Sequence, residues 1–169
     1  MADSGFPPIA GARARLLILG SLPGQESLRQ RQYYAHRANA FWKIMGHILE
    51  AGPDLPYETR ARRLVERRIA LWDVCAAAER PGSLDTAIVR STVVANDFRS
   101  FLEQHPEITR IGFNGAKACE LYRRLVLPGL PRELAAVDRI VLPSTSPAYA
   151  ALPFEEKLAR WQRIVNAGA

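Results

Sequence analysis

The polar groups that could do chemistry in this sequence are mostly amides and hydroxyls. They stand in four short stretches, each directly after an apolar run: residues 20–24 (GSLPG), Asp73, Asn114-Gly115 and residues 143–147 (PSTSP). The sequence offers no nucleophile beside a base, no paired carboxylates and no cluster with metal-ligand spacing. Almost none of the groups present exchanges protons readily near neutral pH. The pattern therefore indicates a site that stabilises developing charge and positions a water molecule.

Four apolar runs predict the strands that position these stretches, at residues 15–19, 69–74, 108–113 and 137–142. Helical periodicity between the strands predicts helices over residues 40–50, 57–67 and 154–165, with others after Asp97 and after Gly115. Alternating strands and helices predict an α/β fold, a single-domain three-layer α/β/α structure with a four-stranded, mainly parallel sheet. Loops that follow parallel strands open on the same edge of the sheet, where ligands bind. We therefore expect the four polar stretches to converge.

Length and hydropathy favour one soluble domain. With 169 residues, 48% of them hydrophobic, the chain can bury a sizeable core. Residues 1–13 contain Gly and two prolines and predict a flexible arm, which leaves residues 14–169 as the domain. No apolar run approaches the roughly 20 residues of a membrane span, and the N-terminus lacks a signal-peptide pattern. We expect a cytoplasmic monomer.

The cysteines and histidines show no pattern of a metal site or a disulfide framework. Cys75 and Cys119 are far apart in apolar surroundings, and His36, His47 and His105 have no ligand spacing. We expect neither a metal nor a cofactor.

A net charge of +6 and an isoelectric point of about 9.8 would suit a polyanionic partner. Nearly all of the positive charge is arginine, much of it within residues 58–68, and an arginine-rich composition can also reflect genomic base composition. The charge thus permits DNA binding without demanding it.

Three motifs resemble those of the uracil-DNA glycosylase superfamily. They are residues 20–24, residues 34–42 (YAHRANAFW) and residues 143–147. The GS-x-PG opening, the YYAH-xx-N-x-FW continuation and the LPSTSP loop resemble, more narrowly, its hypoxanthine-DNA (deoxyinosine) glycosylase branch. Two positions depart from the mismatch-specific branch, because Leu22 stands where that branch has Asn, and Leu142 where it has His or Asn. The usual water-positioning amide and its partner are thus absent, and their role must fall to other residues.

The resemblance implies that DNA containing a deaminated base is the partner and that the nucleotide is flipped out of the duplex. It implies catalytic roles for Asn39, which would orient water or contact the sugar, and for Asn114, which would read the base edge. Tyr34 would stack on the flipped base. Further substrate contacts are expected from Gly20, Ser21, Gln25 and His36. DNA contacts are expected from Ser144, Thr145, Ser146 and Lys117, and from a wedge formed by Pro147 to Tyr149.

Structural explanations compete with several of these assignments. Asn39 and Asn114 each precede a predicted helix, where Asn is a favoured N-cap. Tyr34 could belong to the core and His36 could be structural, while Asp73, Ser83 and Asp85 are common turn and cap residues. Lys117 could be a solvated surface residue.

The function implied is that of a monofunctional DNA glycosylase that removes hypoxanthine first and uracil second and leaves an abasic site. No lysine stands in the core motifs to form a Schiff base, so we expect no lyase step. The alternative is a non-catalytic binder of nucleic acid or nucleotides that uses the same sheet edge. Residues 20–24 give it little support, since they match neither GxGxxG nor a Walker loop.

Overall fold

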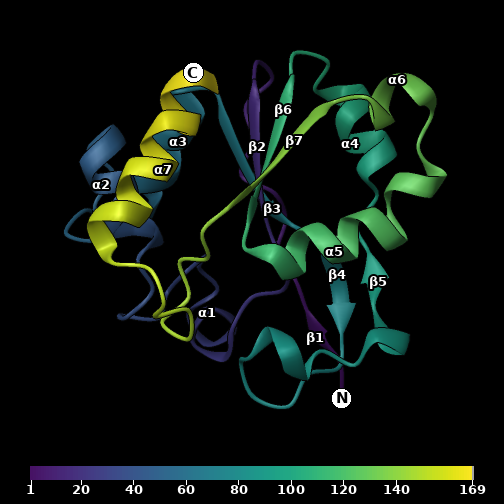
Figure 1. Cartoon of the computed structure of the whole chain (residues 1–169), viewed down its shortest axis with the longest axis horizontal. Coiled ribbons are helices and arrows are strands. Elements are labelled where there is room, and N and C mark those ends of the chain that lie inside the picture. The colour runs from purple at the N-terminus through teal and green to yellow at the C-terminus, as the bar shows by residue number, and fades with distance from the viewer. Residues whose placement is uncertain (169) are drawn as a thin grey trace.

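A four-stranded parallel sheet forms the centre of the protein (Figure 1). A computed structural model describes residues 1–168 of the chain. The strands lie in the order β3-β2-β6-β7. They are β2 (Leu16–Gly20), β3 (Ile69–Asp73), β6 (Arg110–Asn114) and β7 (Asp138–Leu142). Each of the four predicted strands is present, with ends shifted by no more than two residues.

Helices cover both faces of this sheet (Figure 1). One face carries α2 (Phe41–Leu49), α3 (Tyr57–Glu66) and α7 (Phe154–Gly168). The other carries α4 (Phe98–Gln104), α5 (Ala116–Leu125) and α6 (Arg132–Ala135). Side chains of β2 alternate between two separate cores, because Leu17 and Leu19 pack in one while Leu16 and Ile18 pack in the other. The predicted three-layer α/β/α fold is confirmed.

Short elements that the sequence did not reveal surround the sheet. A small antiparallel sheet joins β1 (Asp3–Ser4), β4 (Cys75–Ala78) and β5 (Val94–Ala95). The segment after β2 contains a helix, α1 (Gln25–Gln30). Single 3-10 turns lie at Asp85–Ala87, Arg90–Thr92 and Leu127–Gly129. Strands of two residues are too short to show an alternating pattern, which explains why they escaped prediction.

The N-terminal segment makes specific contacts with the domain. Besides the pairing of β1 with β4, Ile9 forms a β-bridge with Leu71, and Trp72 Nε1 donates a hydrogen bond to the Phe6 carbonyl oxygen at 3.0 Å. We expected a flexible arm here, but these contacts hold the N-terminal segment against the domain.

The order of the strands creates a crevice at one edge of the sheet. Strand β2 pairs with β3 on one side and with β6 on the other, so the connection from β3 to β6 crosses over β2. The carboxyl ends of β2 and β6 thus flank a topological switch point, where α/β folds bind ligands. Within residues 1–168, no helix combines the length and the apolarity needed to cross a membrane.

Candidate active site

A cavity of ≈ 480 Å³ opens at the carboxyl edge of the sheet. It is lined by residues from the end of every strand: Gly20 and Ser21 after β2, Asp73 at the end of β3, Asn114 at the end of β6 and Ser144 after β7. The predicted convergence of the four polar stretches is therefore observed. We call this space the polar cavity.

Gly20 is required because its surroundings leave no room for a side chain. Among the described glycines, only Gly82 and Gly115 have a positive φ, so Gly20 does not need glycine for this reason. A Cβ atom on Gly20 would lie 2.5 Å from Asp73 Oδ1 and 2.8 Å from the Tyr34 hydroxyl oxygen. Only glycine leaves room for these two side chains at the end of β2.

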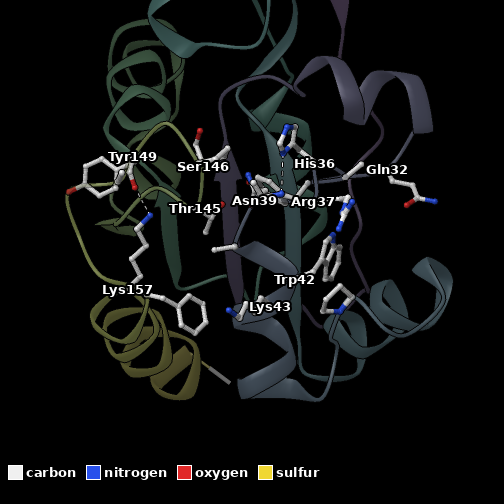
Figure 2. A pocket seen from close by; sticks show the side chains of 18 of the residues that line it. Gln32, His36, Arg37, Asn39, Trp42, Lys43, Thr145, Ser146, Tyr149 and Lys157 are labelled. Carbon is white, nitrogen blue, oxygen red and sulfur yellow. Dashed lines mark hydrogen bonds between the residues drawn. The ribbon is translucent and has the colours of Figure 1, made fainter.

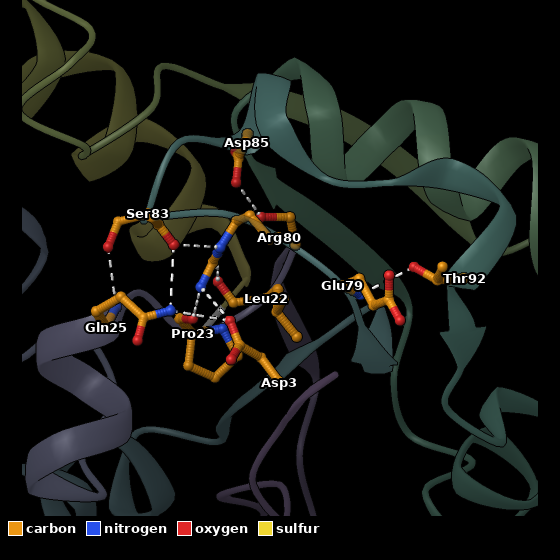
Figure 3. A network of polar contacts seen from close by, with 11 residues as sticks. Asp3, Leu22, Pro23, Gln25, Glu79, Arg80, Ser83, Asp85 and Thr92 are labelled. Atoms are coloured by element: carbon orange, nitrogen blue, oxygen red, sulfur yellow. Dashed lines mark hydrogen bonds and ion pairs between the residues drawn. The ribbon is translucent and has the colours of Figure 1, made fainter. Parts of the chain in front are cut away.

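A buried arginine holds the GSLPG loop in place (Figure 3). The Arg80 side chain, with no exposed surface, donates hydrogen bonds to the carbonyl oxygens of Leu22 at 3.3 Å and of Pro23. It also donates to the Gly82 carbonyl oxygen and to an Asp3 carboxylate oxygen. The carbonyl oxygens of Leu22 and Pro23 lie outside the sheet and have no strand partner there. The hydrogen bonds from Arg80 satisfy them and hold the loop in place.

Tyr34 lies at the floor of the polar cavity in a strained conformation. Its φ of 54° is rare for a residue with a large side chain. Its ring packs against that of Phe41, with centroids 4.3 Å apart, and its hydroxyl is buried without a hydrogen-bond partner among the described residues. Burial, followed by the nearby carboxyl group of Asp73, raises the pKa of Tyr34, and the Asn114 side chain opposes this shift. The hydroxyl therefore remains protonated.

Asn39 lines the cavity and also caps a helix. Its Oδ1 accepts a hydrogen bond from the Phe41 backbone N–H at 2.9 Å, which satisfies an amide in the first turn of α2. The described residues provide no hydrogen-bond partner for its Nδ2, which leaves a donor available. His36 is exposed beside it, and its Nδ1 accepts from the Ala38 backbone N–H at 3.1 Å.

Asn114 is joined to Thr145 by two hydrogen bonds. Its Nδ2 donates to Thr145 Oγ1 at 2.9 Å, and its Oδ1 accepts from the Thr145 backbone N–H at 2.9 Å. Both residues are buried, so Thr145 meets Asn114 rather than solvent. An amide carries two N–H donors and two acceptor lone pairs, and one of each remains for a ligand.

The loop after Thr145 is stabilised by its own short-range bonds. Ser144 Oγ accepts from the Ser146 backbone N–H, and Ser146 Oγ accepts from the Ala148 backbone N–H, each at 3.2 Å. Lys157 Nζ donates to the Tyr149 carbonyl oxygen at 2.6 Å and lies over the Tyr149 ring (Figure 2). The exposed Tyr149 side chain and Pro147 lie at the rim of the cavity.

Three of the predicted site residues have other partners in the structure. Ser21 Oγ donates to Asp85 Oδ1 at 2.6 Å, and Gln25 Nε2 donates to the Gly82 carbonyl oxygen and to an Asp3 carboxylate oxygen, although both residues line the polar cavity. Lys117 lines neither cavity described here, and its Nζ lies 3.5 Å from Glu120 Oε2.

Asp73 was expected at this edge of the sheet, but sequence reasoning assigned it no catalytic or binding role. It is 3% exposed at the end of β3, and its Oδ2 is buried without a hydrogen-bond partner among the described residues. Burial, followed by the carboxylate of Asp85, raises the pKa of Asp73 to about 7, while Arg80 opposes the shift. The sequence left a turn role open for Asp73, because its burial and its contact with Asp85 depend on loops distant in the sequence.

A second cavity, of ≈ 680 Å³, adjoins the first (Figure 2). Four cationic side chains line it, namely Arg37, Lys43, Arg60 and Lys157. None of its described lining residues is acidic. It shares Tyr34, Asn39 and Thr145 with the polar cavity, so the two form one continuous concave surface. We call it the basic cavity.

Comparisons with known proteins identify the family of this chain. The family model described as the Uracil DNA glycosylase superfamily matches residues 7–166. The chain belongs to the uracil DNA glycosylase superfamily. It is 42% identical over 149 residues to the "Hypoxanthine DNA glycosylase" of Methanosarcina acetivorans, covering 88% of this chain and 89% of that protein. It is 40% identical over 123 residues to the protein of the same name from Methanosarcina barkeri, covering 71% and 75%.

A solved structure supports the same assignment. The solution NMR structure of a protein from Methanosarcina acetivorans superposes with a TM-score of 0.80 at 36% sequence identity, covering 99% of this chain and 98% of that one. The resemblance to the superfamily and to its hypoxanthine-DNA glycosylase branch is thus confirmed.

Leu22 and Leu142, where the mismatch-specific branch of the superfamily carries polar residues, are buried in this chain. Leu22 is 6% exposed and Leu142 is 2% exposed, and both pack in the hydrophobic cores. Neither position supplies a polar group. The polar side chains of the cavity are instead those of residues such as Asn39, Asp73 and Asn114.

Proposed function

We propose that this protein is a monofunctional DNA glycosylase that hydrolyses the N-glycosidic bond of a flipped deaminated base, hypoxanthine first and uracil second, and leaves an abasic site. The observation that carries the proposal is the polar cavity, which brings Tyr34, Asn39 and Asn114 together at the switch point of a superfamily member. The names of the two Methanosarcina relatives favour hypoxanthine as the first substrate.

The polar cavity suits a single base in size and in chemistry. Its volume of ≈ 480 Å³ falls within the range of about 300–1,000 Å³ that small-molecule sites occupy. The remaining donor and acceptor of Asn114 can pair with an N–H beside a carbonyl, an arrangement found in hypoxanthine and in uracil. Tyr34 offers an aromatic ring for stacking, braced by Phe41.

Asn39 is suited to hold the attacking water or a sugar oxygen. Its Oδ1 is fixed by the Phe41 N–H, which orients the side chain and points Nδ2 away from the helix end. A preorganised donor of this kind needs no rearrangement as charge develops. Glycosidic hydrolysis that uses such a donor requires no strong base.

The basic cavity is suited to the phosphates beside the flipped nucleotide. Arg37, Lys43 and Arg60 stand where a strand that enters the polar cavity would pass, and none of them has an acidic neighbour in the lining. The exposed Tyr149, braced by Lys157, is placed to act as part of the wedge that fills the vacated stack.

The described lining of the polar cavity contains no lysine. A Schiff base with the sugar needs an amine at the reacting carbon, so the proposal excludes a lyase step. Action as a cytoplasmic monomer is part of the proposal, and size-exclusion chromatography with and without DNA tests the oligomeric state.

The experiment is a strand-cleavage assay. End-labelled duplexes that contain one inosine, one uracil or only normal bases are incubated with the protein, and each sample is divided before treatment with hot alkali. We expect cleavage of the inosine duplex, and more slowly of the uracil duplex, only after alkali. Binding to all duplexes without alkali-labile sites would instead identify a non-catalytic binder.

A further inference from the structure

The carboxyl group of Asp73 lines the polar cavity and has no hydrogen-bond partner among residues 1–168. Asp73 pairs with Gly20 at the ends of β3 and β2, beside the switch point. Its Oδ2 is buried, and neither carboxyl oxygen takes a hydrogen bond from a described residue. Buried polar groups are almost always hydrogen-bonded, so this orphan indicates a missing ligand.

A second buried polar group without a hydrogen-bond partner lies close to the Asp73 carboxyl group. The Tyr34 hydroxyl is also buried without a partner among the described residues. Both Tyr34 Oη and Asp73 Oδ1 approach the point where a Cβ atom would stand on Gly20, at 2.8 Å and 2.5 Å. The carboxyl and the hydroxyl therefore converge on one small region of the cavity, kept open by a residue that has no side chain.

The surroundings of Asp73 favour its neutral form. Arg80, whose positive charge acts on Asp73, is committed to the backbone of the GSLPG loop and to Asp3, and the carboxylate of Asp85 raises the pKa of Asp73. Other titratable groups that interact with this carboxyl come from the segment before α2, from α3 and from β4; they are Tyr33, Tyr34, Tyr57 and Cys75. All four carry a proton in the uncharged state, so none of them supplies a positive charge to hold a carboxylate.

The charge of this group matters for departure of a base. When the C1′–N bond breaks, its electron pair stays on the base, while water bonds to C1′ and releases a proton that balances the charge. A carboxylate at the cavity floor would repel the departing base. A carboxylic acid would instead donate an O–H hydrogen bond to it.

We propose that Asp73, as a neutral carboxylic acid, donates a hydrogen bond to a carbonyl oxygen of the flipped base and stabilises the negative charge that the base gains as it leaves. This role rests on the proposed glycosylase function and deepens it. Hypoxanthine and uracil carry such a carbonyl oxygen on the edge beside an N–H, whereas adenine carries an amino group there. The hydroxyl of Tyr34 is placed to donate to the same region.

The test is a pH profile of single-turnover excision from an inosine duplex, measured between pH 6 and pH 9. In the wild-type protein, we expect the rate to fall above pH 7 as Asp73 loses its proton. Asp73→Asn keeps a neutral donor of the same shape, so its rate should change by less than about threefold across this range. Asp73→Ala removes the donor and should lower the rate at pH 6 by about a hundred-fold or more, the scale for one preorganised donor.

His36→Gln is the control variant, because His36 lines the same cavity as Asp73. Whatever its overall rate, this variant should keep the alkaline fall. The role of Asp73 is overturned if Asp73→Asn keeps the same alkaline fall as the wild type, since the fall would then belong to another group or to the base. It is also overturned if Asp73→Ala retains full activity.

Failure of the proposed function would give a different result, namely no excision by the wild-type protein at any pH. Thermal melting of each variant separates loss of fold from loss of the donor, and if Asp73→Ala does not fold, the profile of Asp73→Asn decides.

Discussion

The Asn114 side chain forms a reciprocal pair of hydrogen bonds with the hydroxyl and the backbone N–H of Thr145, which joins the end of β6 to the loop after β7. The pair fixes the orientation of the Asn114 amide, because one donor and one acceptor are already assigned within the protein. Gly115 makes room for it, since its φ of 94° turns the chain directly after Asn114, and a Cβ there would lie 3.2 Å from Ser144. A catalytic amide held in this way is preorganised by both loops.

Replacement of Asn114 with Asp should lower single-turnover excision of both hypoxanthine and uracil by about a hundred-fold or more. The carboxylate can still accept from the Thr145 N–H and hydroxyl, so the link between the loops survives. However, it lacks the N–H donor and adds a negative charge to the cavity that Asp73 also lines. Equal melting temperatures for variant and wild type would show that the link is kept. Full activity on both duplexes would mean that the base is recognised elsewhere.

Asn39 should show two separable effects. Asn39→Ala removes the cap on α2 and should lower the free energy of unfolding by about 1 kcal/mol, with loss of excision by about a hundred-fold. Asn39→Ser keeps a capping oxygen but has no amide, so it should retain stability and lose activity. Chemical denaturation and single-turnover kinetics measure the two effects. An Asn39→Ser protein with wild-type kinetics would reduce Asn39 to a helix cap.

The basic cavity should account for part of the salt dependence of DNA binding. The double variant Arg37→Ala/Lys43→Ala should bind an abasic duplex more weakly, and the slope of log affinity against log salt should fall by about one for each phosphate that the variant no longer neutralises. Arg123 on α5 lines neither cavity, so Arg123→Ala is the matched control. An unchanged slope in the double variant would place the DNA backbone on another surface.

Asp73 should also make the protein less stable as pH rises. Its pKa is raised from 3.8 to about 7 in the folded state, so the folded protein holds a proton that the unfolded chain releases. The stability that this bound proton contributes is fully present below pH 4, is lost as the pH rises towards 7, and remains absent above pH 7. About three pKa units correspond to about 4 kcal/mol.

Asp73→Asn does not titrate at this position. Its free energy of unfolding relative to wild type should therefore increase by that amount between pH 4 and pH 7 and change little above. Urea denaturation at several pH values measures this difference. A constant difference across the range would show that the carboxyl has an ordinary pKa in the folded protein.

The sheet was predictable from the sequence because each of its strands carries a group of apolar residues that ends in a polar or turn-forming residue. The pairs Gly20 with Asp73 and Asn114 with Leu142 lie in register at the strand ends, so the polar stretches had to meet. By contrast, the two-residue strands and helix α1 carry no periodicity long enough to detect.

The supporting residues of the site were much harder to predict. Arg80 acts through a buried side chain that reaches the backbone of residues distant in sequence, and nothing in the surrounding ERPGS segment reveals this. Asp73 looks like any residue at the start of a turn, and its special character comes from burial and from Asp85 in another loop. Such properties arise from tertiary contacts, which local patterns do not encode.

The central claim is that the polar cavity hydrolyses a glycosidic bond, and release of the free base measures this most directly. Wild-type protein and Asn114→Asp are incubated with an inosine duplex, and free hypoxanthine is quantified by mass spectrometry while the DNA strand is checked for integrity. We expect the wild type to release one hypoxanthine per inosine with the strand intact until alkali is added, and the variant to release almost none. The account would be contradicted by a wild-type protein that binds the duplex and releases no base, or by equal release from both proteins.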